Sequence, residues 1–489
     1  MICALLFLSC GTGARAADDK PPLPPADENA ILVALQAGQV ADAQGRVLRT
    51  DFVTSLLLRP EKALPNGVRI RDARFSTRLD LSNFQVSSSL WLVGCQFADG
   101  IDLTGARIAG DFSLEQSHFA YPTGDHDAND IFNGMKVLGD TNLAGAAFDG
   151  PVDFTNAEFR GEFSADGAKF QAPDTSADFQ YAQFRSTAFF RQAAFTGILK
   201  MWSAQIQDMT LLFDPAGPPP RIEMPQAAVQ RNLAIQGGEM RYLGLAAIRV
   251  LGTATLGPLC VSQQLDLHKA SFDTVSLNIL PCSGKPPGPV SYVSGLRYSF
   301  LTSDNGGPPT DGLLQILSSS NYNGVPGDPN NPPDQGLFPQ YSQFEAFLRA
   351  HDYGADADRV LVAGKRRERE TIPSGWFSFG RWKSKLEDWS VGYGTSPLRP
   401  LLFCILFVIL GSAILDQPLK MDWTDEKIPP QKYSAFWYTL DKFAPVIDLK
   451  VADAWQPKTV GLQRFALALR IFGWILVPLA AAALTGSFK

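Results

Sequence analysis

The cysteines of this chain carry its clearest chemical signal, because two of them are spaced for a disulfide. Six cysteines stand at positions 3, 10, 95, 260, 282 and 404, and none of them belongs to a CxxC pair. That spacing excludes the zinc-ribbon and thioredoxin-type sites that paired cysteines build. Cys260 and Cys282 are 22 residues apart, which is twice the period of a repeat described below.

Two groups of carboxylates have the composition of cation sites. Residues 125–130 (DHDAND) offer the oxygen ligands that calcium prefers, but the glycine and the later glutamate of a calcium loop are missing. We therefore favour a solvated turn for that segment. Asp441 and Asp448 lie between two apolar segments near the C-terminus, where carboxylates from several copies could attract cations to a pore. We prefer the simpler interpretation, an interfacial loop anchored by Trp437 and Tyr438.

No recognised catalytic motif accompanies these residues. The sequence holds no GxGxxG, Walker loop, GxSxG or HExxH pattern, and its 4 histidines are scattered along the chain. We therefore expect a protein that is not an enzyme and binds no cofactor. The formal net charge of −6 over 489 residues also argues against a nucleic-acid partner.

An 11-residue period in the first half of the chain predicts the elements that position these residues. Each unit has apolar residues at positions i, i+2 and i+7 and a small residue at i+5, beginning with Val68, Ile70, Ala73 and Phe75. The pattern recurs as far as Phe272, with an interruption at 120–133. Because side chains two residues apart in a strand share one face, the apolar residues should line the inside of stacked short strands. With two units per turn, we expect roughly seven turns.

This repeat resembles the pentapeptide-repeat family, whose A-(D/N)-L-x-x units form a right-handed, four-sided parallel β-helix. Residues 103–108 (LTGARI) and 156–159 (NAEF) are units of this kind. The resemblance implies a mainly β fold in which the large residue and the small one before it point into the coil. Alternate sides carry one residue more than the family pattern, so we expect one pair of corners to bulge.

The period also places the cysteines on the coil. Cys260 falls on an outward i+6 position, and Cys282 lies one full turn later. Stacked Cα atoms about 4.8 Å apart are within disulfide range, so we predict a Cys260–Cys282 bridge in an exported domain. The alternative is two free thiols, because Leu277 and Ile279 sit one residue off the template. Cys95 occupies an inward position and should be buried and inert.

The other segments give the order of the domains. An apolar start followed by Ala14-x-Ala16 predicts a signal peptide, and the aromatic and basic residues of 376–389 favour a helix on a membrane surface. Two apolar segments, at about 398–415 and 465–484, are long enough for membrane spans. We expect a signal peptide at 1–16, a helical cap at 17–66, the β-helix at 67–282, a Pro/Gly/Asn-rich linker or cap at 283–340, a helical hairpin and interfacial helix at 341–396, and a two-helix membrane module at 397–489.

The C-terminal part resembles a bacterial family of pentapeptide proteins with two C-terminal transmembrane helices. The resemblance rests on Tyr341–Glu370, on Gly392–Pro397 before the first span, and on Tyr438–Leu449 before the second. Some members carry the label membrane-associated oxidoreductase, but no residue here supports redox chemistry. The signal peptide favours a multi-pass inner-membrane protein with a periplasmic β-helix, whereas the basic segment before the first span favours the cytoplasm. We prefer the periplasm, because long preceding domains weaken the charge rule.

These features favour two functions. The first is a non-enzymatic, membrane-anchored β-helical scaffold that presents a ridged face to an unknown protein or polymer of the cell envelope. The alternative is a homo-oligomeric two-helix pore or sensor with the β-helix as its regulatory domain, in which Asp441 and Asp448 meet the ions. An enzyme acting along the β-helix would need a cluster of carboxylates on one face, and the repeat shows none.

Overall fold

The structure is a computed structural model that describes most of the chain. The chain divides into two compact units, Met1–Gln335 and Gly336–Lys489. The predicted signal peptide and residues 125–129 of the acidic segment lie outside the described residues. The described residues are 26–58, 64–121, 130–215, 217–280, 282, 290–303, 307–320, 337–372, 379–395, 398–424, 432–444 and 448–484.

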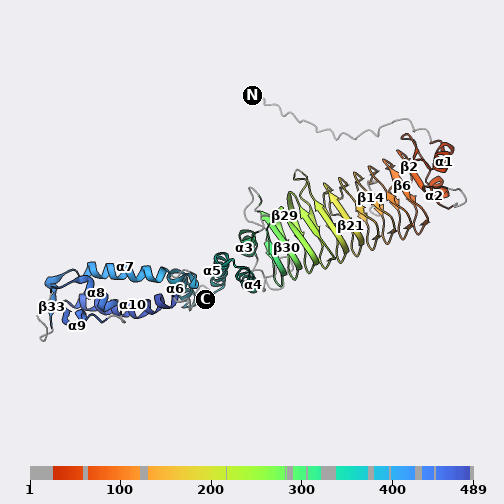
Figure 1. Ribbon diagram of the computed structural model, residues 1–489. Coiled ribbons are helices and arrows are strands. Elements are labelled where there is room, and N and C mark those ends of the chain that lie inside the picture. The colour runs from red at the N-terminus through yellow and green to blue at the C-terminus, as the bar shows by residue number, and fades with distance from the viewer. Residues whose placement is uncertain are drawn as a thin grey trace, which may run out of the picture. The chain divides into compact units, whose positions relative to one another are not determined.

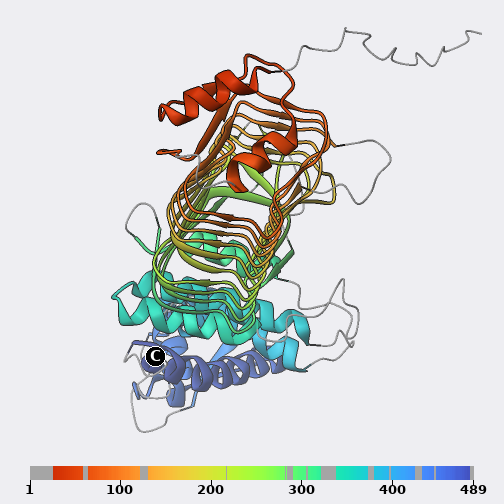
Figure 2. The same cartoon turned by 90° about the vertical axis from the view of Figure 1, so that its right-hand side faces the viewer.

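The first unit is a parallel β-solenoid of about 10 turns, which confirms the predicted fold class (Figure 1). Its strands form four parallel ladders, and Figure 2 shows the successive coils stacked with a similar outline. One ladder contains the six strands β3 (Arg74–Phe75), β7 (Gln96–Phe97), β11 (His118–Phe119), β15 (Ala147–Phe148), β19 (Lys169–Phe170) and β22 (Ala194–Phe195).

The other three ladders run further along the solenoid and share its longest strands. The first follows β1 (Ala41–Asp42), β2 (Val68–Arg71), β6 (Leu90–Val93), β10 (Phe112–Ser113), β14 (Thr141–Asn142), β18 (Phe163–Ser164), β21 (Gln183–Arg191), β24 (Gln205–Leu212), β27 (Leu233–Gln236), β29 (Arg249–Asp266), β30 (Ser271–Leu280) and β32 (Arg297–Thr302). The second follows β4 (Leu79–Asp80), β8 (Ile101–Asp102), β12 (Asp130–Ile131), β16 (Val152–Asp153), β20 (Thr175–Asp178), β23 (Ile198–Lys200), β25 (Arg221–Glu223), β28 (Glu239–Gly244), β29 and β31 (Val290–Tyr292). The third follows β5 (Gln85–Val86), β9 (Arg107–Ile108), β13 (Lys136–Val137), β17 (Glu158–Phe159), β21, β24, β26 (Ala228–Val229), β29, β30 and β32.

Inward-pointing phenylalanines fill the coil. Phe75, Phe97, Phe119, Phe148, Phe170 and Phe195 stack along one ladder, with successive ring centroids 4.8, 4.5, 4.6, 5.3 and 4.9 Å apart. Each ring is at most 1% exposed. The i+7 position of the sequence template therefore supplies a continuous apolar column, in which each coil covers the face that its neighbour leaves open.

The corners of the coil explain the extra residue that alternate sides carry. In many units the residue at i+4 has a positive φ, as at Asn83 and Gly105, so the chain turns there in the left-handed region. The side chain at i+1 commonly accepts a hydrogen bond from the backbone N–H at i+3, as Asp80 does from Ser82 at 2.9 Å. These Asx turns supply the corner that the sequence template predicts as a bulge.

A helix or short helical segment covers each end of the solenoid. α1 (Glu28–Gln36) and α2 (Thr50–Leu58) bury apolar side chains beside the first strands. At the other end α3 (Thr310–Ser319) packs Leu313, Ile316 and Leu317 against β30 and β31. Because the capped ends hide the last open coil, the sides of the solenoid are left as its exposed surface.

The solenoid has more turns than the period predicts. The interruption at 120–133 ends earlier, since β12 begins at Asp130. The 11-residue pattern did not predict two further stretches of coil, between Ile206 and Leu243 and after residue 282. Loops there change the spacing between one unit and the next. Strands therefore run as far as Thr302, beyond the predicted end of the β-helix.

The second unit is helical, and its elements follow the predicted order. A hairpin of α4 (Leu337–Ala350) and α5 (Gly354–Thr371) precedes α6 (Phe379–Val391) and the one-turn η1 (Gly392–Gly394). Figure 1 shows α7 and α10 side by side, with α6 at one end of the pair and β33 at the other. The remaining elements are α7 (Leu398–Leu415), η2 (Pro418–Lys420), β33 (Met421–Trp423), α8 (Ala435–Phe443), α9 (Val451–Ala454), β34 (Trp455–Pro457) and α10 (Val460–Leu484).

Candidate functional site in the helical module

The two long C-terminal helices, α7 and α10, expose most of their apolar side chains. Only 22% of the residues are buried in each of the windows Leu398–Leu415 and Val460–Ala482, whereas a core helix of a soluble protein is mostly buried. Their exposed side chains include Leu402, Ile409 and Ile475, each more than half exposed. Both helices are therefore long enough and apolar enough to cross a membrane.

The short helix α8 is seated against both long helices at two glycines. A Cβ atom at Gly411 of α7 would lie 2.6 Å from the methyl group of Thr439, and one at Gly473 of α10 would lie 1.6 Å from the Phe443 carbonyl oxygen. No side chain fits at either place, so both helices approach α8 as closely as their backbones allow. Tyr438, Thr439 and Phe443 are buried in this contact.

This contact sets how far α8 reaches along the helix pair. The Phe443 ring stacks on Phe407 with centroids 6.1 Å apart, and Phe407 also stacks on Phe472 at 5.2 Å. Phe407 lies eight residues before the end of α7 at Leu415, or about 12 Å at 1.5 Å per residue. α8 thus enters beside the end of α7 and stops near the middle of that helix.

Asp441, one of the two predicted pore-loop acids, turns the chain back toward the end it came from. Its carboxylate accepts hydrogen bonds from the backbone N–H groups of Leu449 at 2.9 Å and Ala452 at 2.7 Å. The segment that leads into α8 is held at the end of α7, where the Tyr433 hydroxyl donates to the Leu415 carbonyl at 2.8 Å. The returning chain reaches the same end, where β34 pairs with β33. Both Asp441 oxygens are thereby engaged with backbone, so this carboxylate positions the return segment.

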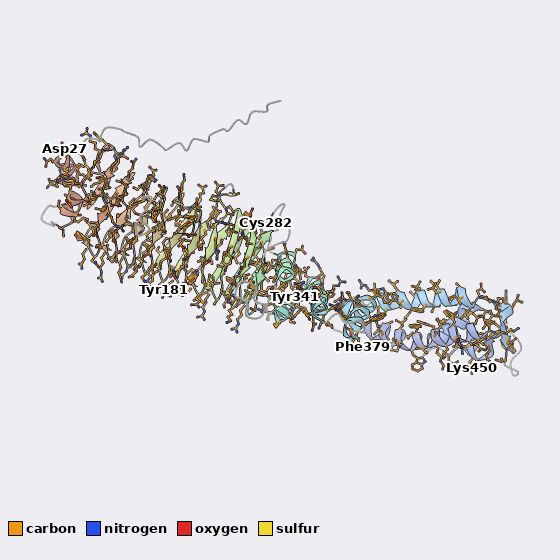
Figure 3. The ribbon with its side chains drawn as sticks, turned by 180° about the vertical axis from the view of Figure 1, so that it is seen from behind. Asp27, Tyr181, Cys282, Tyr341, Phe379 and Lys450 are labelled. Carbon is orange, nitrogen blue, oxygen red and sulfur yellow. A yellow bond between two sulfur atoms is a disulfide. The ribbon has the colours of Figure 1, made fainter. Side chains whose placement is uncertain are left out.

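Asp448, the second predicted acid, is exposed together with Leu449 and Lys450. Its carboxylate accepts from the Lys450 N–H at 3.1 Å, and Lys450 itself has a positive φ of 60°. The structure therefore places Asp441 in α8 and Asp448 in the segment that returns from α8, which together form the α8 hairpin (residues 435–454). Only Asp448 presents its carboxylate outward. Figure 3 labels Lys450 and Phe379 toward opposite ends of the α7–α10 pair.

A network of ion pairs joins α5 to α6 at the end of the pair where α7 begins. Asp388 of α6 pairs with Arg366 at 2.9 Å and with Arg369 at 3.2 Å, both on α5. Hydrogen bonds, first from Arg366 and then from Arg369, hold the pKa of Asp388 below its usual value. α6 keeps its aromatic side exposed, with Phe379 82% and Trp382 71% accessible. This is the amphipathic helix that the sequence predicts for a membrane surface.

The predicted cysteine pair lies at the α3 end of the solenoid. Cys260 and Cys282 form a disulfide with their Cα atoms 5.2 Å apart, and Figure 3 labels Cys282 there. In the ladder Cys260 faces Leu280, so Cys282 reaches it from two residues beyond the strand pairing. Cys95 is buried, and its burial raises the pKa of its thiol to about 12. The low reactivity expected of Cys95 follows from that environment.

A buried carboxylate in the solenoid core, Asp130, is not among the residues that the sequence pattern singles out. Asp130 stands at position i of a unit whose other inward residues are Phe132, Met135 and Val137, and these three could have revealed it. Burial raises the pKa of Asp130 to about 7, although the Ile101 N–H donates to its carboxylate at 3.1 Å. No cluster of three metal-ligating side chains occurs in the described part of the chain.

Comparison with protein-family models, with curated proteins and with solved structures finds no match for this chain.

Proposed function

We propose that α7 and α10 anchor this chain in a lipid bilayer and that the β-solenoid acts as a non-enzymatic scaffold for a protein or polymer of the cell envelope. The exposure of α7 and α10 is the observation that carries the proposal, since only a fifth of their residues are buried. Aqueous exposure of so much apolar surface is unfavourable, and a bilayer removes it. The capped ends leave the long sides of the solenoid as its surface for partners.

Two further parts of the proposal concern family and compartment. The four ladders and the small inward residues support membership in the pentapeptide-repeat class. The Cys260–Cys282 bridge supports an exported solenoid in an oxidising compartment, and hence an inner-membrane protein with a periplasmic solenoid.

Thiol labelling tests both the anchoring and the side of the membrane. Spheroplasts expressing the full chain are treated with a membrane-impermeant maleimide, intact or permeabilised, before and after mild reduction, and the membrane fraction is then washed with carbonate. We expect the chain to stay in the membrane and Cys260 and Cys282 to react from outside only after reduction. The Cys260→Ser/Cys282→Ser variant serves as the control and should remain unlabelled. Reaction without reduction, and only in opened cells, would overturn the periplasmic assignment. Release by carbonate would overturn the anchoring.

A second candidate function, an oligomeric pore, is favoured by the depth of the α8 hairpin. Irregular backbone is tolerated inside a bilayer only where protein buries it or where it lines water. In a single copy of the chain, the segment after α8 exposes Asp448, Leu449 and Lys450. This segment follows the end of α8, which lies near the middle of α7. If α7 spans the bilayer, copies packed around this surface would satisfy that requirement and place Asp448 along a shared aqueous path.

Ion flux from liposomes tests the pore. We expect the reconstituted full chain to conduct cations and the Asp448→Asn variant to lose most of that flux, because a ring of carboxylates concentrates cations. Asp422→Asn is the matched control, since Asp422 pairs with Lys458 at 2.9 Å on the β33–β34 hairpin. Absence of flux, or equal loss in both variants, would remove the pore from consideration.

A further inference from the structure

A pocket between α5, α6 and α10 has the composition of a phospholipid site. Its volume is about 700 Å³, and it lies at the end of the helix pair where α7 begins and α10 approaches its last turns. Mostly polar side chains of α5, α6 and η1 form one wall, and aliphatic side chains of α10 form the other. Lys365, Arg369, Lys383 and Tyr393 are on the polar wall, and Ile475 and Leu479 are on the aliphatic wall.

The chain around this pocket is strongly basic. Between Lys365 and Arg399 the sequence has eight lysines and arginines against four aspartates and glutamates, a local net charge of +4 in a chain whose total is −6. The other end of the helix pair is balanced: residues 416–459 hold six basic and seven acidic residues. Clusters of basic residues next to membrane helices attract anionic lipids electrostatically.

Two lysines at the pocket remain available to a ligand. Arg366 and Arg369 are engaged with Asp388. Within the described residues, Lys365 and Lys383 pair with acids of their own helices, Glu368 at 3.0 Å and Glu387 at 3.8 Å, and their side chains are 49% and 66% exposed. Exposed pairs of that kind contribute little, so a phosphate can displace the carboxylates at small cost.

We propose that this pocket binds one anionic phospholipid, with its phosphate between Lys365 and Lys383 and an acyl chain along Ile475 and Leu479. The aliphatic wall distinguishes a lipid from free phosphate, because free phosphate gains nothing from Ile475 and Leu479. The Ser384 and Tyr393 hydroxyls, 2.7 Å apart, bond to each other and leave one hydroxyl hydrogen on the polar wall as a donor. This proposal rests on the anchoring of α7 and α10 in a bilayer. The bound lipid would hold α5 and α6 against the membrane face.

Native mass spectrometry of the full chain in detergent tests the assignment. With equal amounts of phosphatidylglycerol and phosphatidylcholine, we expect selective retention of one phosphatidylglycerol. The Lys365→Gln/Lys383→Gln variant should lose that preference by about thirtyfold, because each lysine contributes a factor of roughly five. The Lys420→Gln/Lys458→Gln variant, altered at the balanced end of the helix pair, should retain it.

The possible failures are distinguishable. Equal retention of both lipids by a chain that resists carbonate extraction would overturn the lipid site and leave the anchoring intact. Displacement of phosphatidylglycerol by millimolar inorganic phosphate would show a phosphate site without lipid specificity and would also overturn the proposal. Release of the chain from membranes by carbonate would overturn the anchoring itself.

Discussion

Replacement of Phe148 by alanine is expected to destabilise the solenoid by about 3–5 kcal/mol. The Phe148 ring is fully buried between Phe119 at 4.6 Å and Phe170 at 5.3 Å, stacked on both. Removing it opens a cavity in a column whose backbone is held by parallel ladders on either side, so the neighbours cannot collapse to fill it. The loss should be concentrated in the adjacent coils, because each coil contacts only its neighbours.

Hydrogen exchange of the full chain measures this effect, since it reports opening coil by coil. Amides of β11, β15 and β19 should lose protection, while those of β29 and β30 stay close to wild type. Phe189→Ala makes the same chemical change on an outward, partly buried ring that lies under Arg191 at 4.5 Å. We expect less than about 1 kcal/mol there. Equal losses at Phe148 and Phe189 would contradict the role assigned to the stacked column.

The solenoid was predictable because its physical requirement repeats in the sequence. A closed coil needs apolar residues at fixed intervals. These intervals are already visible in the first complete turn, at Val68, Ile70 and Phe75. The 22-residue spacing of Cys260 and Cys282 carried the same information, since stacked coils bring residues one turn apart together. The remaining coils were not predicted because loops interrupt the period. The residues between Ile206 and Leu243 follow the 11-residue template, but a loop changes their spacing from the units before them.

The helical module was predictable in its order but not in its packing. Hydropathy indicates where α7 and α10 lie, because length and apolar composition are properties of each segment alone. Nothing local to residues 435–443 tells that α8 packs between two glycines on separate helices. Gly411 and Gly473 are 62 positions apart, and their function depends on a close approach that only the three-dimensional arrangement shows. The different roles of Asp441 and Asp448 follow from the same packing.

Replacement of Asp130 by asparagine is expected to stabilise the solenoid at neutral and alkaline pH but not in acid. Asp130 occupies an inward position level with Val152, where most coils have an aliphatic residue. Its burial raises the pKa from the ordinary value of 3.8 to about 7. The folded state therefore holds the proton more tightly than the unfolded state, and stability falls as pH rises from about 4 to 7. A difference of about 3 pKa units corresponds to about 4 kcal/mol at most.

The asparagine variant keeps the acceptor for the Ile101 N–H but does not titrate, so its stability lacks this pH dependence. Hydrogen exchange in β8 and β12, measured between pH 5 and pH 8 and corrected for the intrinsic exchange rate, should show a gap between variant and wild type that widens with pH. Asp153→Asn is the matched control: Asp153 follows Val152 in β16, points outward and accepts from the Thr155 N–H at 2.8 Å. Its substitution controls for the change from carboxylate to amide on the outside of the coil. If the difference in protection between Asp130→Asn and wild type did not change with pH, the Asp130 carboxyl would ionise normally in the folded protein. Water would then reach this carboxyl, and the burial assigned to it would be wrong.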